Sequence, residues 1–281
     1  LHPIRTKLPE CPDWDKIDNF GLPKERQVFV REEIPPLLTQ LISQINIAIK
    51  KNKELKSKQK KEDYFYEVFW ETLENNLRYK KVLDWVEEQW YYRLNGKWIF
   101  INGKPTYIPK NHWFYINYWS LEAVTYPEYR ERDREWFWAM EYFKQDTTIP
   151  KKTEDGKFLY NDDGSLQLID VGYRTIEGVI VTKSRRSGDT TKATCDIFCD
   201  TVLSKDAHCG IQGDKEDTGK QVFETKLKYA YDRLLPIWKY KIDHNVESAL
   251  LFNNGDIDEC INARIDYTSA NPTAYDGQKL Y

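Results

Sequence analysis

The sequence has few residues of the kinds that define specialised classes of protein. Its 281 residues include one methionine and only five cysteines, at widely spaced positions: Cys11, Cys195, Cys199, Cys209 and Cys260. A structural zinc site needs four ligands, usually in closely spaced pairs, and no second pair lies near Cys195 and Cys199. We therefore expect the cysteines to be small buried hydrophobic residues in a reducing, cytosolic compartment.

A long apolar segment and a strong net charge are also absent. No run approaches the roughly 20 apolar residues that span a bilayer, so we expect no membrane helix. The formal net charge of −3 excludes a global field that attracts nucleic acid, so any DNA-binding surface must be a local patch. The first residues are polar, contain prolines and include neither a signal peptide nor an initiator methionine, as in a processed or trimmed chain.

Aromatic residues and lysines, in contrast, are locally abundant. Aromatic residues make up 15% of the chain, with ten tryptophans, and they concentrate between residues 64 and 143. Such residues fill a core or stack on bases and sugars, and a core is the favoured interpretation. Seven lysines fall between Lys50 and Lys61. We interpret them as a solvated helix end, with contact to a phosphate backbone as the alternative.

Local patterns predict most elements of the first 170 residues. An irregular arm precedes a helix over residues 27–60, and a second helical pattern runs from Asp63 to Leu94. The Asn102-Gly103 pair in "KWIFINGKPTYI" is a strong hairpin signal, and "HWFYINYWSLEA" follows it as a half-buried segment. A helix is predicted to begin near Pro127. "FLYNDDGSLQLI" carries a second hairpin signal and is expected to lie on the surface.

The pattern changes after residue 170. A strand at Gly178–Val181, a helix over Thr190–Leu203, the strand "AHCGIQG" and a helix over Thr218–Leu235 alternate, which is typical of a parallel sheet covered by helices. The runs "ESALLFNN" and "CINARIDYTSA" are expected to pair as an antiparallel element. The fold class is therefore α/β, with four regions: 1–62, 63–150, 151–170 and 171–281.

One stretch, "VTKSRRSGDTTKA" at residues 181–193, points to a specific chemistry. It has the order strand, glycine turn, threonines, helix. A phosphate-binding loop is built in this way, because backbone N–H groups at a helix N-terminus point at an anion and the helix dipole favours it. In such loops a lysine contacts the phosphates and a Ser or Thr hydroxyl binds Mg²⁺.

The stretch also departs from the usual phosphate loop. The first glycine is absent, and Asp189 stands where the lysine is expected. A carboxylate about 4 Å from a phosphate charge costs on the order of 4 kcal/mol, a roughly thousandfold loss of affinity, unless nearby cations offset it. Lys183, Arg185 and Arg186 are such cations, with Lys192 one turn further on. The alternative is a helix N-terminus capped by Asp189, with the arginines merely solvated.

The motif "KSRRSGDTT" resembles the phosphate loop of the large terminase subunits of tailed phages, the ATP-driven motors that pack DNA into capsids. In that family a basic Ser-Arg element precedes Gly-x-Thr/Ser. "GIQG" and "SANPTAYDGQKLY" are similar to later elements of the family. The aromatic segments "YRLNGKWIFINGKPTYIPKNHWFYINYWSL" and "YPEYRERDREWF" resemble the region before the ATPase core in terminases of gut-associated, crAss-like phages. The resemblance covers residues 63–281.

The resemblance implies a fold and a set of site residues. It implies an aromatic-rich helical region, residues 63–150, attached to part of a RecA-like P-loop ATPase core with a mainly parallel sheet, residues 171–281. Lys183 would be the displaced phosphate lysine, Arg185 the catalytic arginine and Thr190 the Mg²⁺ ligand. Arg130 and Asp133 would lie on the adenine side. The remaining ATP-binding residues would be Ser184, Arg186, Ser187, Gly188, Asp189 and Thr191.

The resemblance also implies a function: ATP and Mg²⁺ are bound and hydrolysed to translocate double-stranded DNA. The expected partners are the portal protein, the small terminase subunit and further copies in a ring, at the procapsid portal in the host cytoplasm. The sequence ends at Tyr281, before an Asp-Glu strand and a nuclease domain, so we assign no catalytic base and expect nucleotide binding with almost no hydrolysis. The alternatives are a non-catalytic aromatic-rich interaction module, or another phosphate-loop enzyme such as a helicase or a small-molecule kinase.

Overall fold

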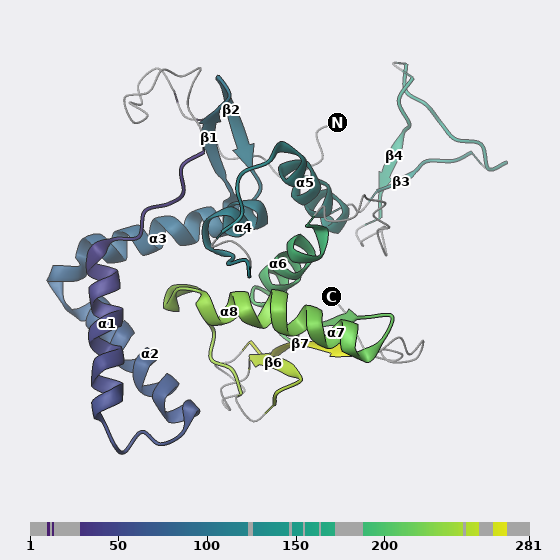
Figure 1. The fold of residues 1–281 in the computed structure, drawn as a ribbon. Helices are drawn as coiled ribbons and strands as arrows, with labels where there is room; N and C mark the ends of the chain where they lie inside the picture. Colours follow the sequence, from purple (N-terminus) through teal and green to yellow (C-terminus); the bar gives the residue numbers. More distant parts are fainter. Residues whose placement is uncertain are drawn as a thin grey trace.

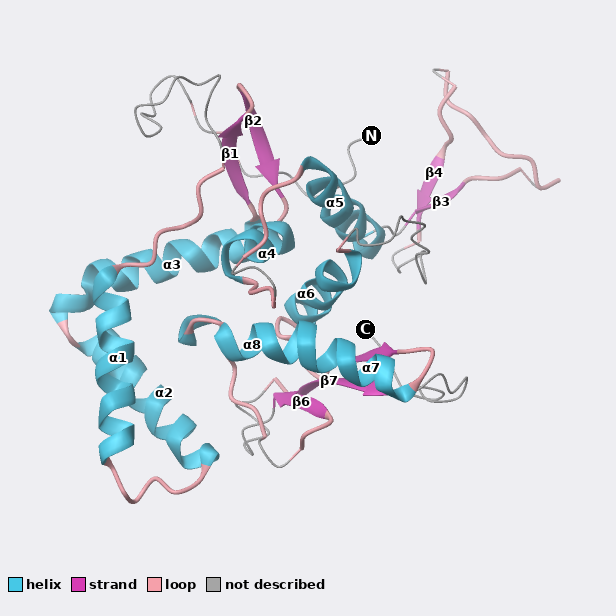
Figure 2. Ribbon diagram, viewed as in Figure 1, coloured by secondary structure: helices cyan, strands magenta, loops and turns pink. Residues whose placement is uncertain are grey.

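The computed structural model describes residues 10, 11, 13, 29–122, 126–145, 148–153, 155–162, 164–171, 188–243, 246–252 and 261–268. Within these ranges the chain is a mixed α/β protein in which helices dominate and the strands form small sheets (Figures 1 and 2). None of the helices in these ranges is both long enough and apolar enough to cross a membrane.

The N-terminal part is a helical hairpin of α1 (Pro36–Lys51) and α2 (Lys58–Asn75). The prediction of one helix over residues 27–60 is therefore wrong at both ends. Proline at the first helical position starts α1 at Pro36. Ser57 starts a new helix, because its side chain accepts a hydrogen bond from the Lys60 N–H at 3.2 Å. The lysine-rich run thus spans the turn between two helices.

The elements that follow match the predictions closely. A short 3₁₀ helix η2 (Leu77–Tyr79) leads into α3 (Lys80–Asn95). Strands β1 (Lys97–Ile101) and β2 (Lys104–Ile108) then pair antiparallel. The turn residues Asn102 and Gly103 have φ of 51° and 75°, as a two-residue hairpin turn of the primed kind requires. The predicted hairpin is confirmed.

The aromatic block fills the core. "HWFYINYWSLEA" was predicted to be half-buried, but its helix α4 (Lys110–Tyr118) is almost wholly enclosed, and Trp113, Phe114 and Trp119 are at most 1% exposed. Helix α5 (Glu131–Gln145) begins four residues after Pro127 and packs against α4. The interpretation of the aromatic residues as core is confirmed for this part of the chain.

Residues 148–170 form an arm at one side of the molecule (Figure 1). Strands β3 (Thr148–Pro150) and β4 (Leu168–Asp170) pair antiparallel, and isolated bridges continue the pairing beyond them. This is the predicted surface excursion. Five of its large apolar side chains are exposed: Phe158, Tyr160, Leu166, Leu168 and Ile169.

The C-terminal part contains a three-stranded sheet in the order β5-β7-β6. Strand β5 (His208–Gln212) is parallel to β7 (Ala263–Thr268), and β6 (Ala249–Phe252) is antiparallel to β7, which confirms the predicted antiparallel pair. The described sheet is therefore mixed, in place of the mainly parallel sheet that was expected. The predicted strand at residues 178–181 lies outside the described residues.

Two helical segments accompany this sheet. Helix α6 (Asp189–Thr201) begins directly after the glycine turn, within one residue of the prediction. A continuous helix consists of α7 (Glu216–Val222), a π-helical segment (Phe223–Lys228) and α8 (Tyr229–Arg233), and it lies along the sheet in Figure 1. It corresponds to the helix predicted over residues 218–235.

Candidate functional site

The candidate site is the N-terminus of α6, where the phosphate loop was predicted to end. Gly188 has φ 81° and ψ 7°, a left-handed conformation that glycine adopts without strain. Its carbonyl oxygen accepts the first helical hydrogen bonds, from Thr191 N at 3.1 Å and Lys192 N at 3.2 Å. No heavy atom of the described chain lies within 4 Å of a Cβ placed at Gly188. Among the described residues, it is therefore backbone conformation and not lack of space that favours glycine here.

Only part of the predicted ATP site can be placed. Lys183, Ser184, Arg185, Arg186 and Ser187 lie outside the described residues. The other predicted contacts, Gly188 to Thr191, are consecutive and lie at the start of α6, so the structure brings these four together.

Thr190, the predicted Mg²⁺ ligand, is the second helical residue and is exposed. In the part of the chain that the structure describes, there is no group of three or more His, Cys, Asp or Glu side chains that could hold a metal. In the predicted site Thr190 would offer Mg²⁺ one hydroxyl ligand, and the ion would depend on the phosphates and water for most of its coordination.

Three charged side chains meet at the first turn of α6. They are here called the Lys192 ion group: Asp133, Asp189 and Lys192. Lys192 Nζ is 2.6 Å from Asp189 Oδ1 and 2.9 Å from Asp133 Oδ1. Lys192 is 3% exposed and Asp133 is 5% exposed, so the ammonium and one of its carboxylates are shielded from water. Ion pairs in such surroundings are strong only when their geometry is good, and both distances here are those of direct hydrogen bonds.

This group shows what the Asp189 side chain contacts. The cap position of α6 belongs to Gly188, which has no side chain, and Asp189 is the first helical residue. The alternative in which Asp189 caps the helix is therefore wrong. The Asp189 carboxylate is instead bound by Lys192, one turn along the same helix. Its negative charge also lies at the positive end of the helix dipole, which stabilises it.

The first turn of α5 lies against the start of α6. It carries Glu131 and Asp133, and the Trp136 ring centroid lies 5.4 Å from Lys192 Nζ. Arg130, just before the helix, is exposed. The structure thus brings the predicted adenine-side motif "YRERD" to the start of α6, through the contact of Asp133 with Lys192. The role of Asp133 as the partner of Lys192 was not predicted.

His112 on α4 is a buried group that the sequence analysis missed. It is fully buried, and within the described chain neither of its ring nitrogens has a hydrogen-bond partner. Its ring stacks on Phe137, with centroids 5.3 Å apart, and lies 5.7 Å from the ring of Tyr129. Burial, together with the positive charge of Arg134, lowers the pKa of His112 to about 3. The ring is therefore neutral near pH 7. A single histidine among aromatic residues gives no sequence signal.

A second polar network fixes the far side of α6. Lys144 Nζ on α5 lies 2.5 Å from both Asp196 Oδ2 and Asp200 Oδ2, and Asn111 on α4 donates to Asp196 Oδ1 at 2.7 Å. Burial alone would lower the pKa of Lys144, but the two carboxylates outweigh it and hold that pKa above its usual range. Arg93 on α3 donates to Asn111 Oδ1 at 3.2 Å. Three helices therefore hold α6 in place.

The cysteines largely behave as predicted. Cys195, Cys199 and Cys209 are buried, whereas Cys11 is exposed and departs from the expectation. Cys195 Sγ lies 3.9 Å from Cys199 Sγ on the same face of α6. Cys260 lies outside the described residues.

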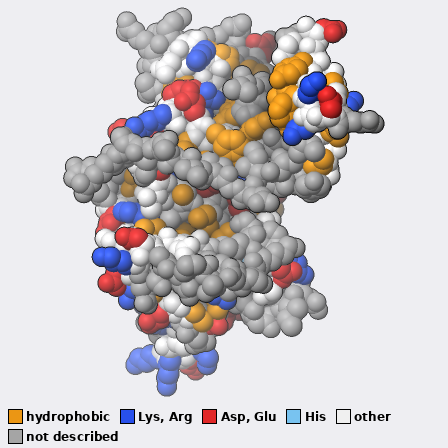
Figure 3. Space-filling model, turned by 90° about the vertical axis from the view of Figure 1, so that its right-hand side faces the viewer, with side chains coloured by type: hydrophobic (Ala, Val, Ile, Leu, Met, Phe, Trp, Pro, Cys, Tyr) orange, Lys and Arg blue, Asp and Glu red, His pale blue; other side chains and the backbone are white. Residues whose placement is uncertain are grey.

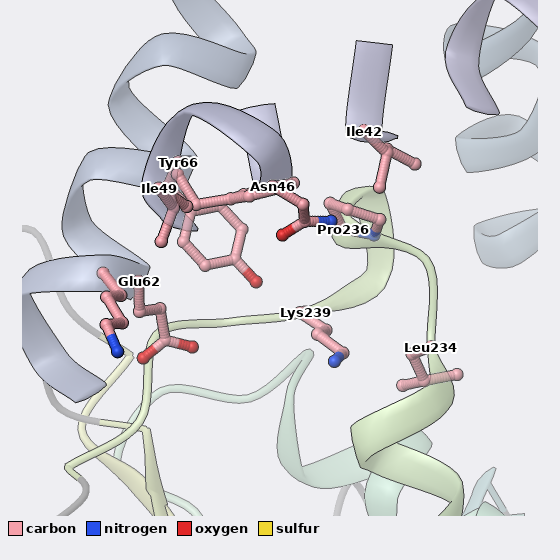
Figure 4. Close-up of a pocket in the computed structure, with 10 residues that line it drawn as sticks. Ile42, Asn46, Ile49, Glu62, Tyr66, Leu234, Pro236 and Lys239 are labelled. Atoms are coloured by element: carbon pink, nitrogen blue, oxygen red, sulfur yellow. The ribbon is translucent and has the colours of Figure 1, made fainter. Parts of the chain in front are cut away.

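A separate pocket of about 390 Å³ lies between the α1–α2 hairpin and residues 234–239 (Figure 4). Its volume is within the range of small-ligand sites. Figure 4 shows the Tyr66 hydroxyl and the Lys239 amine directed into it, with Ile42, Leu234 and Pro236 as apolar neighbours. No residue of α6 contributes to its lining, so it is distinct from the candidate site.

In comparisons with family models, curated proteins and solved structures, nothing matches the chain.

Proposed function

We propose that the chain is the ATP-binding portion of a DNA-packaging motor, a large terminase subunit of a crAss-like phage, which couples ATP hydrolysis to translocation of double-stranded DNA. The observation that carries the proposal is the left-handed Gly188 turn that opens α6. It supplies a helix N-terminus without a side chain at the cap, the arrangement that binds phosphate through backbone N–H groups. The residues "KSRRSGDTT" supply the cations and hydroxyls around it.

The Lys192 ion group supports the proposal against its main objection. A carboxylate at position 189 would repel a phosphate strongly if its charge were uncompensated. Asp189 Oδ1 is 2.6 Å from Lys192 Nζ, so a cation already neutralises much of its field. The Ser-Arg loop can then act on the phosphates through Lys183, Arg185 and Arg186 without first offsetting Asp189.

Each residue of the loop would have a distinct role. Lys183 would contact the phosphates, Thr190 would donate its hydroxyl oxygen to Mg²⁺, and Arg185 would stabilise charge on the transferred phosphoryl group. The backbone and side chains of Ser184, Arg186, Ser187, Asp189 and Thr191 would complete the cradle. Bound MgATP supplies the phosphoanhydride bond whose hydrolysis drives movement.

The parallel pair of strands is consistent with a nucleotide-binding fold. The carboxyl ends of β5 and β7, at Gln212 and Thr268, are paired in register at one edge of the sheet. In open α/β sheets, ligands bind outside the carboxyl ends of the strands. A RecA-like core, the portal and small-subunit partners, a ring of copies on the procapsid and a host-cytoplasmic location follow from the proposed family.

The proposal is tested by calorimetric titration of the chain with MgATP. The expected result is saturable binding that Lys183→Ala abolishes. Lys151→Ala, which removes an exposed lysine on the arm, is the matched control and should bind like the unchanged chain. Equal binding by Lys183→Ala would remove the displaced lysine from the site. Absence of binding to the unchanged chain would overturn the proposal.

A second candidate function is a non-catalytic interaction module. The exposed apolar arm favours it, since Phe158, Tyr160 and Leu168 are 46%, 58% and 53% exposed. Exposed apolar side chains in one element commonly mark a docking surface. This candidate predicts that MgATP does not raise the melting temperature, whereas the motor predicts that it does.

A further inference from the structure

The turn between α1 and α2 carries a dense positive charge, here called the lysine tip: Lys50, Lys51, Lys53, Lys56, Lys58, Lys60 and Lys61. All seven side chains are exposed. Residues 50–61 contain these seven lysines and one acidic residue, Glu54, so their net charge is +6; since the chain carries −3, all other residues together carry −9. Figure 3 shows Lys and Arg side chains gathered at the lower end of the molecule, where this turn lies in Figure 1.

The described part of the chain forms no ion pair that compensates this charge. Within the described residues, none of the seven lysines forms an ion pair, and the nearby Asp63 is 3.2 Å from Lys241 instead. Lys50 and Lys51 end α1, where the helix dipole favours cations. Lys58 and Lys60 begin α2, whose first turn has no acidic residue and where the dipole disfavours cations. Helix stabilisation therefore does not explain the lysines that start α2, and an external anion would.

The composition of the tip indicates which anion. Residues 50–61 contain no arginine and no aromatic residue. Arginine reads base edges through two parallel hydrogen bonds, and aromatic rings stack on unpaired bases, so neither base readout nor single-strand binding is favoured. Surface-bound membrane helices insert exposed apolar side chains, and the single apolar residue here, Leu55, is partly buried. The lysine ammonium groups are point charges on flexible side chains, and such groups favour contact with the phosphate backbone of a duplex.

We propose that the lysine tip binds the phosphate backbone of duplex DNA without sequence preference. The identity of DNA as the physiological polyanion rests on the proposed function, whereas the contact itself requires no nucleotide. The tip belongs to the α1–α2 hairpin and the ATP site to the start of α6, so the two surfaces can be altered separately.

Fluorescence anisotropy of a short labelled duplex, titrated at several salt concentrations, tests the proposal. Lys58→Glu/Lys60→Glu alters the tip. Lys80→Glu/Lys81→Glu is the matched control, because it changes two exposed lysines in the first turn of α3, which also lacks an acidic residue, and makes the same change in net charge. The tip variant should lose roughly tenfold in affinity and about 2 units in the slope of log affinity against log salt. The control should stay within roughly twofold.

Several results would overturn the proposal: an equal loss in the two variants, no loss in either, or tip-dependent binding to phosphatidylserine vesicles and not to duplex DNA. If thermal melting shows that the tip variant is unfolded, Lys53→Glu/Lys56→Glu changes the connecting residues outside both helices and replaces it. Calorimetry with MgATP separates the two proposals. If the chain binds DNA through the tip but does not bind MgATP, the proposed function is overturned and the tip proposal stands. If the chain binds MgATP but the tip variant binds DNA normally, the tip proposal is overturned and the proposed function stands.

Discussion

Lys192 Nζ lies 2.9 Å from Asp133 Oδ1, and this contact joins the first turns of α6 and α5. Both residues are at most 5% exposed, so neither charge is solvated by bulk water. The contact therefore sets how α5 meets the helix that begins at Gly188. It also holds Lys192 beside Asp189. The same ammonium group therefore joins two helices and compensates the negative charge of Asp189 at the candidate site.

Removal of this ammonium should strongly destabilise the fold. Lys192→Met removes the close, buried cation of Asp133 and leaves only the longer 3.7 Å contact with the exposed Arg132. It should therefore lower the free energy of unfolding by about 3 to 5 kcal/mol. Urea denaturation measures the change. In a double-mutant cycle, Asp133→Asn combined with Lys192→Met should cost less than the sum of the single changes, because the buried carboxylate is then absent.

The control for this prediction is Lys226→Met. Its ion pair with Glu122 is longer, at 3.4 Å, and the two side chains are 34% and 53% exposed. Loss of such a surface pair should change the free energy of unfolding by no more than about 1 kcal/mol. Strict additivity of Asp133→Asn and Lys192→Met would show that the two residues are not energetically coupled.

Asp189→Asn should have a small effect on MgATP affinity. Because Lys192 already compensates the Asp189 carboxylate, removal of that charge should tighten binding by less than about tenfold, far below the roughly thousandfold of an uncompensated charge. Calorimetric titration measures the ratio, and Asp162→Asn, which removes an exposed charge on the arm, is the control. A gain of several hundredfold would mean that Lys192 does not shield Asp189 from the phosphates.

Local features of the sequence were predictable because their causes are local. The Asn102-Gly103 turn needs positive φ at two adjacent residues, and these two residue types tolerate it, so the hairpin can be read from its turn alone. The start of α6 was predicted within one residue because Gly188 and the helical pattern after it mark the boundary. The antiparallel pair of β6 and β7 followed from alternating apolar and polar residues.

The contacts that organise the site could not be predicted in the same way. Asp133 and Lys192 are 59 residues apart, and nothing in the sequence indicates which of the 45 acidic residues meets Lys192. The helix break after Lys51 was missed for a different reason. Asn52 and Ser57 stabilise the turn through single side-chain hydrogen bonds, to Glu54 N and Lys60 N, and such signals are weak beside a run of good helix formers.

Gly188 and Gly213 are constrained for different reasons, so their substitution by alanine should destabilise the fold to different extents. Gly188→Ala forces a left-handed conformation on alanine but meets no neighbour in the described chain, so it should cost about 1 to 2 kcal/mol. Gly188→Asn should cost less, because asparagine tolerates this conformation. Gly213→Ala would place its Cβ 2.4 Å from Gly219 N, a backbone atom, and should cost roughly 2 to 3 kcal/mol or more.

Urea denaturation of the three variants checks this order. An asparagine at position 188 as damaging as alanine would show that backbone strain is not the cause. The Gly188 variants also bear on function, since a change in MgATP affinity larger than the change in stability would mean that the turn geometry itself contacts the nucleotide.

The stability of the protein should fall in mild acid because of His112. The folded-state pKa of His112 is about 3, below the ordinary value of 6.5. The unfolded chain therefore takes up a proton below pH 6.5 that the folded chain takes up only near pH 3. The stabilising contribution is fully present above pH 6.5 and is lost progressively as the pH falls toward 3, by about 2 kcal/mol at pH 5.

His112→Phe should remove this dependence. Phenylalanine keeps a ring between Phe137 and Tyr129 and leaves no unpaired ring nitrogens, so unfolding of the variant in urea should change less between pH 7.5 and pH 5 than that of the unchanged chain. The control is His208→Gln, at a histidine whose Nε2 lies 3.0 Å from Asp266 Oδ2 on the sheet. It retains His112 and should keep the steep acid dependence. If the His112→Phe variant loses stability in acid as steeply as the control, the acid sensitivity arises elsewhere, and the burial of a neutral imidazole against α5 is not its source.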